Sequence, residues 1–451
     1  MARLLCGVAG RALPQQAALF SLLLGALGEL ELPERKDDVD RALPFMAHAA
    51  DRALVLEYLL DLLQYLPPLA SGEASAPPGL SVAAAKRVCG KLDPAEVRGE
   101  LLAAKKLAAC RLLAAPASRE HPREAGALFT PAETLAHWLV ASCDGEPAVQ
   151  AAGEAELRKL SHGLDLEQPP LIDALCRLVV GAPASSSGTP AADARRAAAV
   201  AVRAKAVGYL SRSVAAASHF PGALQATFHA IFAPDASPKL QQAGCGLAEW
   251  LVNHAQPALL AVAGAHLLSG LLKVLRGEAH PGLRAEAAEA VAMRSHAYGA
   301  LAAMARRAPE LVRTEEGLPA ELFGALQTED AGARTALHEA LAALADVHAP
   351  GHAGRPLPPR VGARLRALLA NSAMAPAPQA RLAAMTWAGR VFARSDVLTR
   401  LVCLAGAADT RSEVREAALA ALRPPGGMQE RRHTAVPAAP AAAAIVASAR
   451  V

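Results

Sequence analysis

A regular spacing of small apolar residues recurs along most of the chain and is clearest near its C-terminal end. In the segment SEVREAALAAL (412–422), apolar side chains follow Val414 at three, four, seven and eight positions. This spacing places them on one face of a helix. Thr410 and Glu413 have the spacing of a capping box at a helix start, and Arg415 directly follows Val414. The pattern predicts a helix that buries a single face.

The same pattern is found in six segments upstream. The seven first apolar positions are Val149, Ala194, Leu240, Leu283, Ala333, Ala380 and Val414. Consecutive positions are 34 to 50 residues apart. A period of roughly 40–47 residues with two helices per unit is typical of HEAT and armadillo repeats. The sequence therefore predicts an all-α fold, an α-solenoid of HEAT/armadillo-like helix-pair repeats.

Two further features accompany the pattern. In four of the seven segments a proline stands two positions before the first apolar residue, where a helix tolerates the missing N–H. In all seven an arginine or glutamine stands one position after it. We interpret these polar side chains as contacts between neighbouring turns of the stack rather than as ligand-binding groups. The first helices of the units are expected at 134–143, 224–233, 258–275 and 318–327.

The boundaries of the array follow from composition. Residues 1–424 are predicted to form the solenoid, interrupted by Pro-, Gly- and Ser-rich loops near 66–81 and 181–193. Residues 425–451 are of low complexity and are expected to form a disordered tail. The first 30 residues carry two arginines and no acidic residue before Glu29, so they are either a targeting segment or a partial repeat.

Composition narrows the class of protein. The chain has 451 residues, of which 53% are hydrophobic and only 3% aromatic, and its net charge is +4. So small an excess does not indicate a nucleic-acid partner, and no run of 18 uncharged apolar residues predicts membrane insertion. The seven cysteines form no C-x-x-C pair, which favours reduced, structural thiols.

No catalytic, cofactor-binding or metal-binding residues are predicted. Gly90 and Lys91 lack the other residues of a phosphate-binding loop. His348 and His352 are four residues apart, but Pro350 and Gly351 between them favour a loop exposed to solvent over a metal site. The three tryptophans are expected in the core. No enzyme activity, cofactor or small-molecule substrate is expected, and binding residues stay unassigned.

Five segments, in order, resemble a known family, the large HEAT-repeat proteasome adaptor and scaffold proteins first named as an extracellular-mutant gene product in yeast. They are PPGLSVAAAKRVCG (77–90), LVASCDGEPAVQAAGEAELRKL (139–160), HFPGALQATFHAIF (219–232), LFGALQTEDAGARTALHEALAAL (322–344) and VFARSDVLTRLVCLAGAADTRSEVREAAL (391–419). The resemblance covers most of residues 30–422 and is to the N-terminal region of these much longer proteins.

The resemblance implies a non-enzymatic function. Members bind the 26S proteasome, contact subunits of its core particle and of its ATPase-bearing regulatory particle, and influence assembly, stability or quality control. They act in the cytoplasm and nucleus. The family has no catalytic residues to carry over to this chain. The alternative is a general HEAT-repeat adaptor for another complex, such as a transport or phosphatase scaffold.

Overall fold

A computed structural model describes residues 52–64, 99–114, 129–160, 163–181, 197–280, 282–349 and 357–423. Every regular element within these ranges is an α-helix. The chain divides into two compact units, Met1–His348 and Ala349–Val451. Each unit is described by itself below.

The described part of the first unit contains fourteen helices. They are α4 (Arg52–Gln64), α6 (Gly99–Leu113), α7 (Pro131–Ala141), α8 (Pro147–Leu160), α9 (Pro169–Val180), α10 (Val200–Leu210), α11 (Val214–Ala217), α12 (Gly222–Phe232), α13 (Pro238–His254), α14 (Pro257–Leu275), α15 (Ala288–Arg307), α16 (Pro309–Arg313), α17 (Leu318–Ala325) and α18 (Ala331–His348). The described part of the second unit has four: α19 (Pro359–Ala373), α20 (Pro378–Val391), α21 (Val397–Gly406) and α22 (Ser412–Leu422).

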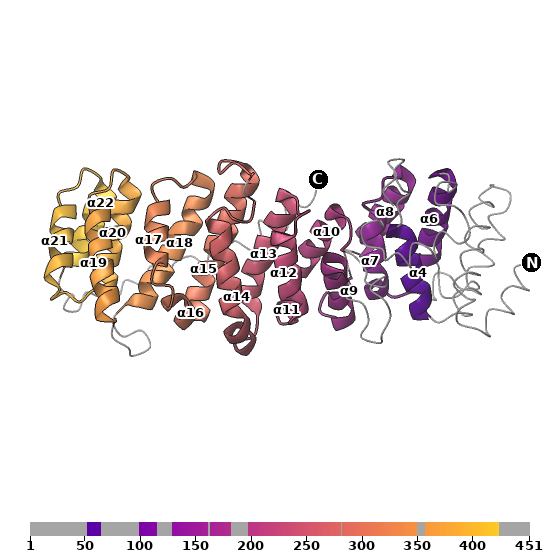
Figure 1. Cartoon of the computed structure of the whole chain (residues 1–451), viewed down its shortest axis with the longest axis horizontal. Coiled ribbons are helices and arrows are strands. Elements are labelled where there is room, and N and C mark those ends of the chain that lie inside the picture. Colours follow the sequence, from indigo (N-terminus) through magenta and orange to yellow (C-terminus); the bar gives the residue numbers. More distant parts are fainter. Residues whose placement is uncertain are drawn as a thin grey trace, which may run out of the picture. The chain divides into compact units, whose positions relative to one another are not determined.

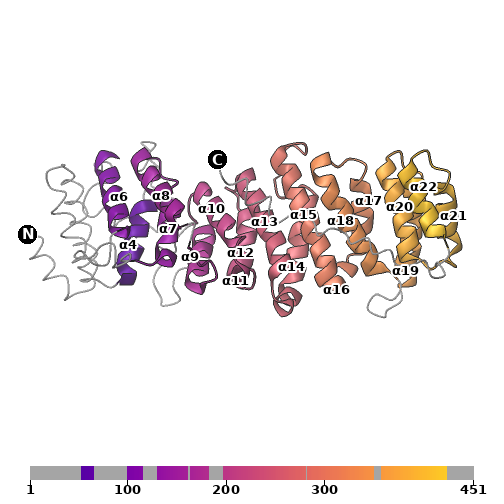
Figure 2. The same cartoon turned by 180° about the vertical axis from the view of Figure 1, so that it is seen from behind.

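Within the first unit these helices form consecutive pairs such as α7/α8, α12/α13 and α14/α15, and both views show them following one another in chain order (Figures 1 and 2). The second helices α10, α13, α15 and α18 pack against one another in succession. In the second unit α19 packs on α20 and α21, and α22 packs on α20 and α21. The protein is therefore an all-α solenoid of HEAT/armadillo-like helix pairs, as the sequence predicts.

Alanine and glycine on the inner faces allow close approach of the helices. Ala300 on α15 and Ala340 on α18 are fully buried where these long helices pack. On α13, a Cβ added at Gly244 would come within 2.9 Å of the Ala230 Cβ on α12. Small side chains at these positions are thus required by the short distance between helices.

Five of the seven predicted first positions are buried in second helices: Val149, Leu240, Ala333, Ala380 and Val414. Three of the predicted prolines (Pro147, Pro238 and Pro378) are the first residues of their helices. Ala194 lies outside the described residues. The predicted first apolar positions and the prolines before them thus match the packing of most second helices.

The predicted register at Leu283 is wrong. This residue lies half-buried in the turn before α15, and the helix begins only at Ala288. Met293 takes the buried first position, and Arg294 follows it. In α10 the corresponding pair is Val202 and Arg203. Because this segment is rich in alanine, the apolar spacing fits more than one helix register. Only the register seen in the structure buries the large side chain of Met293.

The predicted capping box at Thr410 and Glu413 is also wrong. Helix α22 begins at Ser412, and its N-cap residue, Arg411, makes no side-chain capping bond. The Asp409 carboxylate instead accepts a hydrogen bond from the Arg411 N–H at 2.9 Å. The predicted first helices correspond to α7, α12, α14 and α17, with ends that differ by up to three residues.

Several predictions concern residues outside the described ranges. These are the loop at 66–81, all but Gly181 of the loop at 181–193, the N-terminal residues 1–30 and the tail at 425–451. They stay predictions.

One described helix, α14, is long and apolar enough to cross a membrane by length and composition alone. Half of its most apolar stretch is buried in the first unit. Leu260, Leu267 and Leu271 on this helix are almost fully buried. Core packing therefore accounts for the composition of α14.

Candidate functional site

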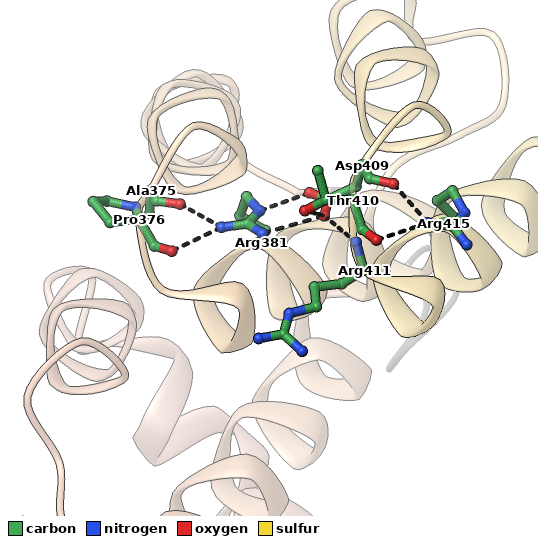
Figure 3. Close-up of polar contacts among 7 residues, drawn as sticks. All are labelled: Ala375, Pro376, Arg381, Asp409, Thr410, Arg411 and Arg415. Carbon is green, nitrogen blue, oxygen red and sulfur yellow. Dashed lines mark hydrogen bonds and ion pairs between the residues drawn. The ribbon is translucent and has the colours of Figure 1, made fainter.

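A polar contact joins one helix pair to the next, and it is clearest at Arg381 (Figure 3). The guanidinium group donates to both carboxylate oxygens of Asp409, at 2.6 and 3.2 Å. It also donates to the backbone carbonyls of Ala375 and Pro376, at 2.9 Å each. Arg381 thus links the turn of its own pair, α19/α20, to the turn of the following pair, α21/α22. The Arg381 hydrogen bond lowers the pKa of Asp409 to about 2.

The same contact recurs in the first unit. Arg294 donates to the Glu329 carboxylate at 2.9 and 3.1 Å and to the carbonyl of Ala285 at 3.0 Å. Tyr298 donates its hydroxyl to Glu329 at 2.8 Å. Burial alone would raise the pKa of Glu329, but the bonds from Arg294 and Tyr298 lower it. Two further pairs of the same kind are Lys106–Asp144 and Arg203–Asp235.

These contacts test the prediction that the polar residue after each first position stabilises the stack. Gln241 donates to the carbonyls of Ile231 at 2.8 Å and Ala279 at 2.9 Å. Arg334 and Arg415 donate to carbonyls of the turn before their own helix. The predicted contact between neighbouring turns of the stack is confirmed for Gln241 and Arg381, whereas the printed bonds of Arg334 and Arg415 stay within their own helix pair. Gln150 instead bonds Glu154 one turn along the same exposed helix surface.

Within the described ranges, no three His, Cys, Asp or Glu side chains gather closely enough to hold a metal ion. The prediction that His348 lies in an exposed loop is wrong. It is the last residue of α18 and is 5% exposed. Burial, assisted by the Arg313 guanidinium, lowers its pKa to about 4. His352 lies outside the described residues. The helix persists to the end of the sequence ADVH because its last turn packs in the core.

The described tryptophans and cysteines are structural. Trp138 and Trp387 are buried, and Trp250, half-buried, donates its indole N–H to the Ser213 carbonyl at 2.8 Å. All five described cysteines are free thiols, and four are buried. Burial raises the pKa of Cys110, Cys176 and Cys245 to about 12. These thiols stay protonated at neutral pH and are poor nucleophiles.

A groove of about 520 Å³ with a mixed polar and apolar lining, the α15/α18 groove, lies between α15 and α18. Its lining includes Glu286, Ser295, His296 and Asp330, with Gly332 leaving the space open. The Glu249 carboxylate on α13 makes a hydrogen bond of 2.7 Å with His296 Nδ1. This single His–Glu pair is about one-third exposed and has no nucleophile bonded to it.

A second groove, also of about 520 Å³, lies in the second unit between α19 and α21. Its lining is almost wholly apolar and consists of Ala363, Arg366, Ala367, Ala370, Ala373, Met374, Leu398, Leu401, Val402 and Ala405. Met374 is 80% exposed, Leu398 59% and Leu401 56%. We refer to these ten residues as the α19/α21 groove. Large exposed apolar side chains gathered in a hollow are typical of contact surfaces.

The sequence matches the family described as proteasome component ECM29, N-terminal, over residues 1–406. The chain belongs to this family. The human protein named proteasome adapter and scaffold protein ECM29 is 25% identical over 450 residues, which are 93% of this chain and 23% of the human protein. The chain therefore spans less than a quarter of the length of this relative.

Two solved structures are partly similar. Importin beta crystallised in an ammonium sulfate condition gives a TM-score of 0.40 at 13% identity, covering 90% of this chain and 49% of that one. A Kap121p mutant gives a TM-score of 0.39 at 13% identity, covering 91% and 40%.

The family match ends at the last residue of α21. All ten residues of the α19/α21 groove therefore lie within the ECM29 N-terminal region, as do those of the α15/α18 groove. Neither groove is predicted from the sequence, and no binding residue is assigned there. The sequence does carry one signal for the second: in VLTRLVCLAG (397–406), apolar residues fall on more than one helical face, more than a single buried stripe needs.

Proposed function

We propose that this chain is a non-enzymatic scaffold or adaptor that binds the 26S proteasome and supports its assembly, stability or quality control. The observation that carries the proposal is the match to the ECM29 N-terminal family over residues 1–406. The human relative is named an adapter and scaffold protein of the proteasome, which agrees with this proposal. The proposed partners are subunits of the core particle and of the regulatory ATPase particle, in the cytoplasm and nucleus.

The proposed mechanism is docking at several points. Within each unit, contacts such as Arg381–Asp409 and Arg294–Glu329 hold one helix pair against the next, so surface residues on those pairs keep a fixed spacing. A fixed array can contact several subunits weakly, and each bound contact raises the effective concentration of the others. In this proposal the proteasome, and not this chain, carries out the chemistry on the substrate.

Binding is tested by native gel electrophoresis of purified 26S proteasome mixed with increasing amounts of the full 451-residue chain. We expect a retarded proteasome band, with the chain found in that band by mass spectrometry. A two-fold excess of unlabelled chain should displace labelled chain. If neither 26S proteasome nor its separated core and regulatory particles bind at micromolar concentration, the proposal is wrong.

The alternative, an adaptor for another complex, predicts a different result. Affinity capture of the tagged chain from cell extract should then recover transport cargo or phosphatase subunits in place of proteasome subunits. Recovery of both proteasome particles in stoichiometric amounts supports the proposal. Capture from extract pre-cleared of proteasome is the control for indirect recovery.

A further inference from the structure

The α19/α21 groove has a floor of small side chains and one wall of large ones. Ala363, Ala367 and Ala370 are exposed on α19 at intervals of four and three residues, which places them on one helical face. Leu398 and Leu401 on α21 line the same groove beside these alanines. The result is a trench about three helical turns long, running along α19 between two fixed helices.

The wall that α21 forms is held in place. On α21, Thr399, Cys403 and Gly406 are buried and anchor the opposite side of the helix. The Asp396 carboxylate caps the helix by accepting from the Thr399 N–H at 3.1 Å. The leucines are therefore exposed because the helix is fixed with that face outward, and not because the helix is loosely packed.

The exposed side of α21 contains two different surfaces. Leu398, Leu401 and Ala405 line the groove toward α19, whereas Val397 and Leu404, 70% and 57% exposed, do not line it. In a solenoid a further helix pair would pack on the side of α21 that faces away from α19. Such a pair could cover Val397 and Leu404 and would leave the groove open.

The second unit carries an excess of positive charge. Residues 357–423 contain ten arginines, no lysine and four acidic residues, a formal charge of +6, although the whole chain carries only +4. No acidic residue lines the groove, and Arg366 does. Its guanidinium is fixed by the Asp396 carboxylate at 2.8 Å and lies 5.1 Å from the Phe392 ring centre. Arg360 and Arg364 lie one turn apart at the N-terminal end of α19.

We propose that the α19/α21 groove binds an amphipathic helix of a partner protein, whose apolar stripe enters the trench and whose flanking Asp or Glu side chains face the arginines. A trench between two helices accepts the apolar residues of a third at positions i, i+3 or i+4 and i+7. A second copy of this chain is a poor occupant, since residues 357–423 of each copy carry a formal charge of +6 and repel each other. The inference goes beyond proteasome binding and does not depend on it.

The test uses two fluorescein-labelled peptides with the same leucine stripe, one flanked by glutamates and the other by lysines. Binding to the full chain is followed by fluorescence anisotropy. We expect the glutamate peptide to bind at least about tenfold more tightly than the lysine peptide, with the difference shrinking as salt is raised. Equal binding of both peptides, or no binding up to about 100 μM, would overturn the proposal.

Substitutions in the chain test whether the peptide binds in the α19/α21 groove. The double substitution Leu398→Ser with Leu401→Ser should weaken binding of the glutamate peptide by about tenfold or more, because exposed apolar anchors are lost. The matched control is Val262→Ser on α14, where a side chain 78% exposed is removed from the other unit, and binding should change less than about twofold. Ala370→Gln, which fills the floor from an exposed position, tests the trench independently of the leucines.

Two further outcomes would also overturn the proposal. Binding of anionic lipid vesicles that is abolished by the leucine double variant would assign the groove to a membrane surface. A dimer seen by analytical ultracentrifugation for the native chain and lost in the same variant would assign it to self-association. Circular dichroism and urea unfolding of each variant confirm that a change in binding is not a change in folding.

Discussion

The contact between Arg381 and Asp409 gives the most direct test of how the helix pairs are held together. Replacing Arg381 by methionine keeps most of the side-chain volume and removes four hydrogen bonds. The Asp409 carboxylate keeps only local donors, such as the Arg411 N–H at 2.9 Å. Both charged side chains are mostly buried, 16% and 10% exposed. We therefore expect a clear loss of stability in the second unit.

The lowered pKa of Asp409 gives the size of the expected loss of stability. Its decrease from 3.8 to about 2 corresponds to about 2 kcal/mol at neutral pH, because each pH unit is worth about 1.4 kcal/mol. Screening by solvent at the edge of the contact reduces this to about 1–2 kcal/mol. The two carbonyl acceptors add about 1 kcal/mol. Arg381→Met should thus lower the free energy of unfolding by about 2–3 kcal/mol at pH 7.

The pH dependence has a definite sign. The folded state binds a proton on Asp409 less readily than the unfolded state, so the stabilisation is fully present above about pH 4. It is lost as the pH falls toward about 2. The gap between native protein and Arg381→Met should therefore narrow over this range.

Urea unfolding at several pH values measures the effect. Trp387 lies in α20, in the second unit, whereas Trp138 and Trp250 lie in the first. Replacing the latter two by phenylalanine makes fluorescence report on the second unit alone. The matched control is Arg411→Met, since the Arg411 side chain points away from Asp409 (Figure 3). If both arginine variants lose equal stability at pH 7, or if the gap does not narrow in acid, the reasoning is refuted.

Two further predictions concern buried positions in the first unit. Because the pKa of His348 is lowered in the folded state, the free energy of unfolding should fall as the pH drops from about 6.5 toward 4. Urea unfolding of His348→Gln at several pH values should show a weaker dependence on pH. An unchanged dependence would contradict the lowered pKa of His348. Gly153→Ala should lower the free energy of unfolding by about 1–3 kcal/mol, because the added Cβ would lie 2.4 Å from the Ser142 nitrogen. Its control, Gly208→Ala, meets no atom within 4 Å and should stabilise the helix by up to about 1 kcal/mol. Thermal unfolding followed by circular dichroism distinguishes the pair, and equal effects would argue against the tight packing at Gly153.

Helix pairing could be predicted from the sequence because each second helix buries one narrow stripe. At Ala380 and Val414 a single register satisfied the spacing, and the structure agrees. At Leu283 alanine-rich neighbours offered several registers, and the burial of Met293 decided between them. Local spacing carries no information about which of several small apolar faces meets a neighbouring helix.

Other features depend on contacts that are distant in sequence. His348 stands beside a proline and glycine that indicated a loop, yet the core holds the helix to its last turn. The partner of Arg381 lies 28 residues away, so the type of contact could be predicted but its acceptor could not. The α19/α21 groove arises where two helices about 30 residues apart come together. From sequence alone Leu398 and Leu401 were indistinguishable from core residues.

The contact that Gln241 makes between helix pairs differs from the charged contacts of Arg294 and Arg381. Its donor is an uncharged amide, and both of its acceptors are backbone carbonyls. Acid therefore leaves this contact unchanged, while the contacts of Arg294 and Arg381 weaken as their carboxylates are protonated. Acidification is therefore expected to weaken the charged contacts and to spare the contact of Gln241, so the resistance of neighbouring helix pairs to separation differs from turn to turn.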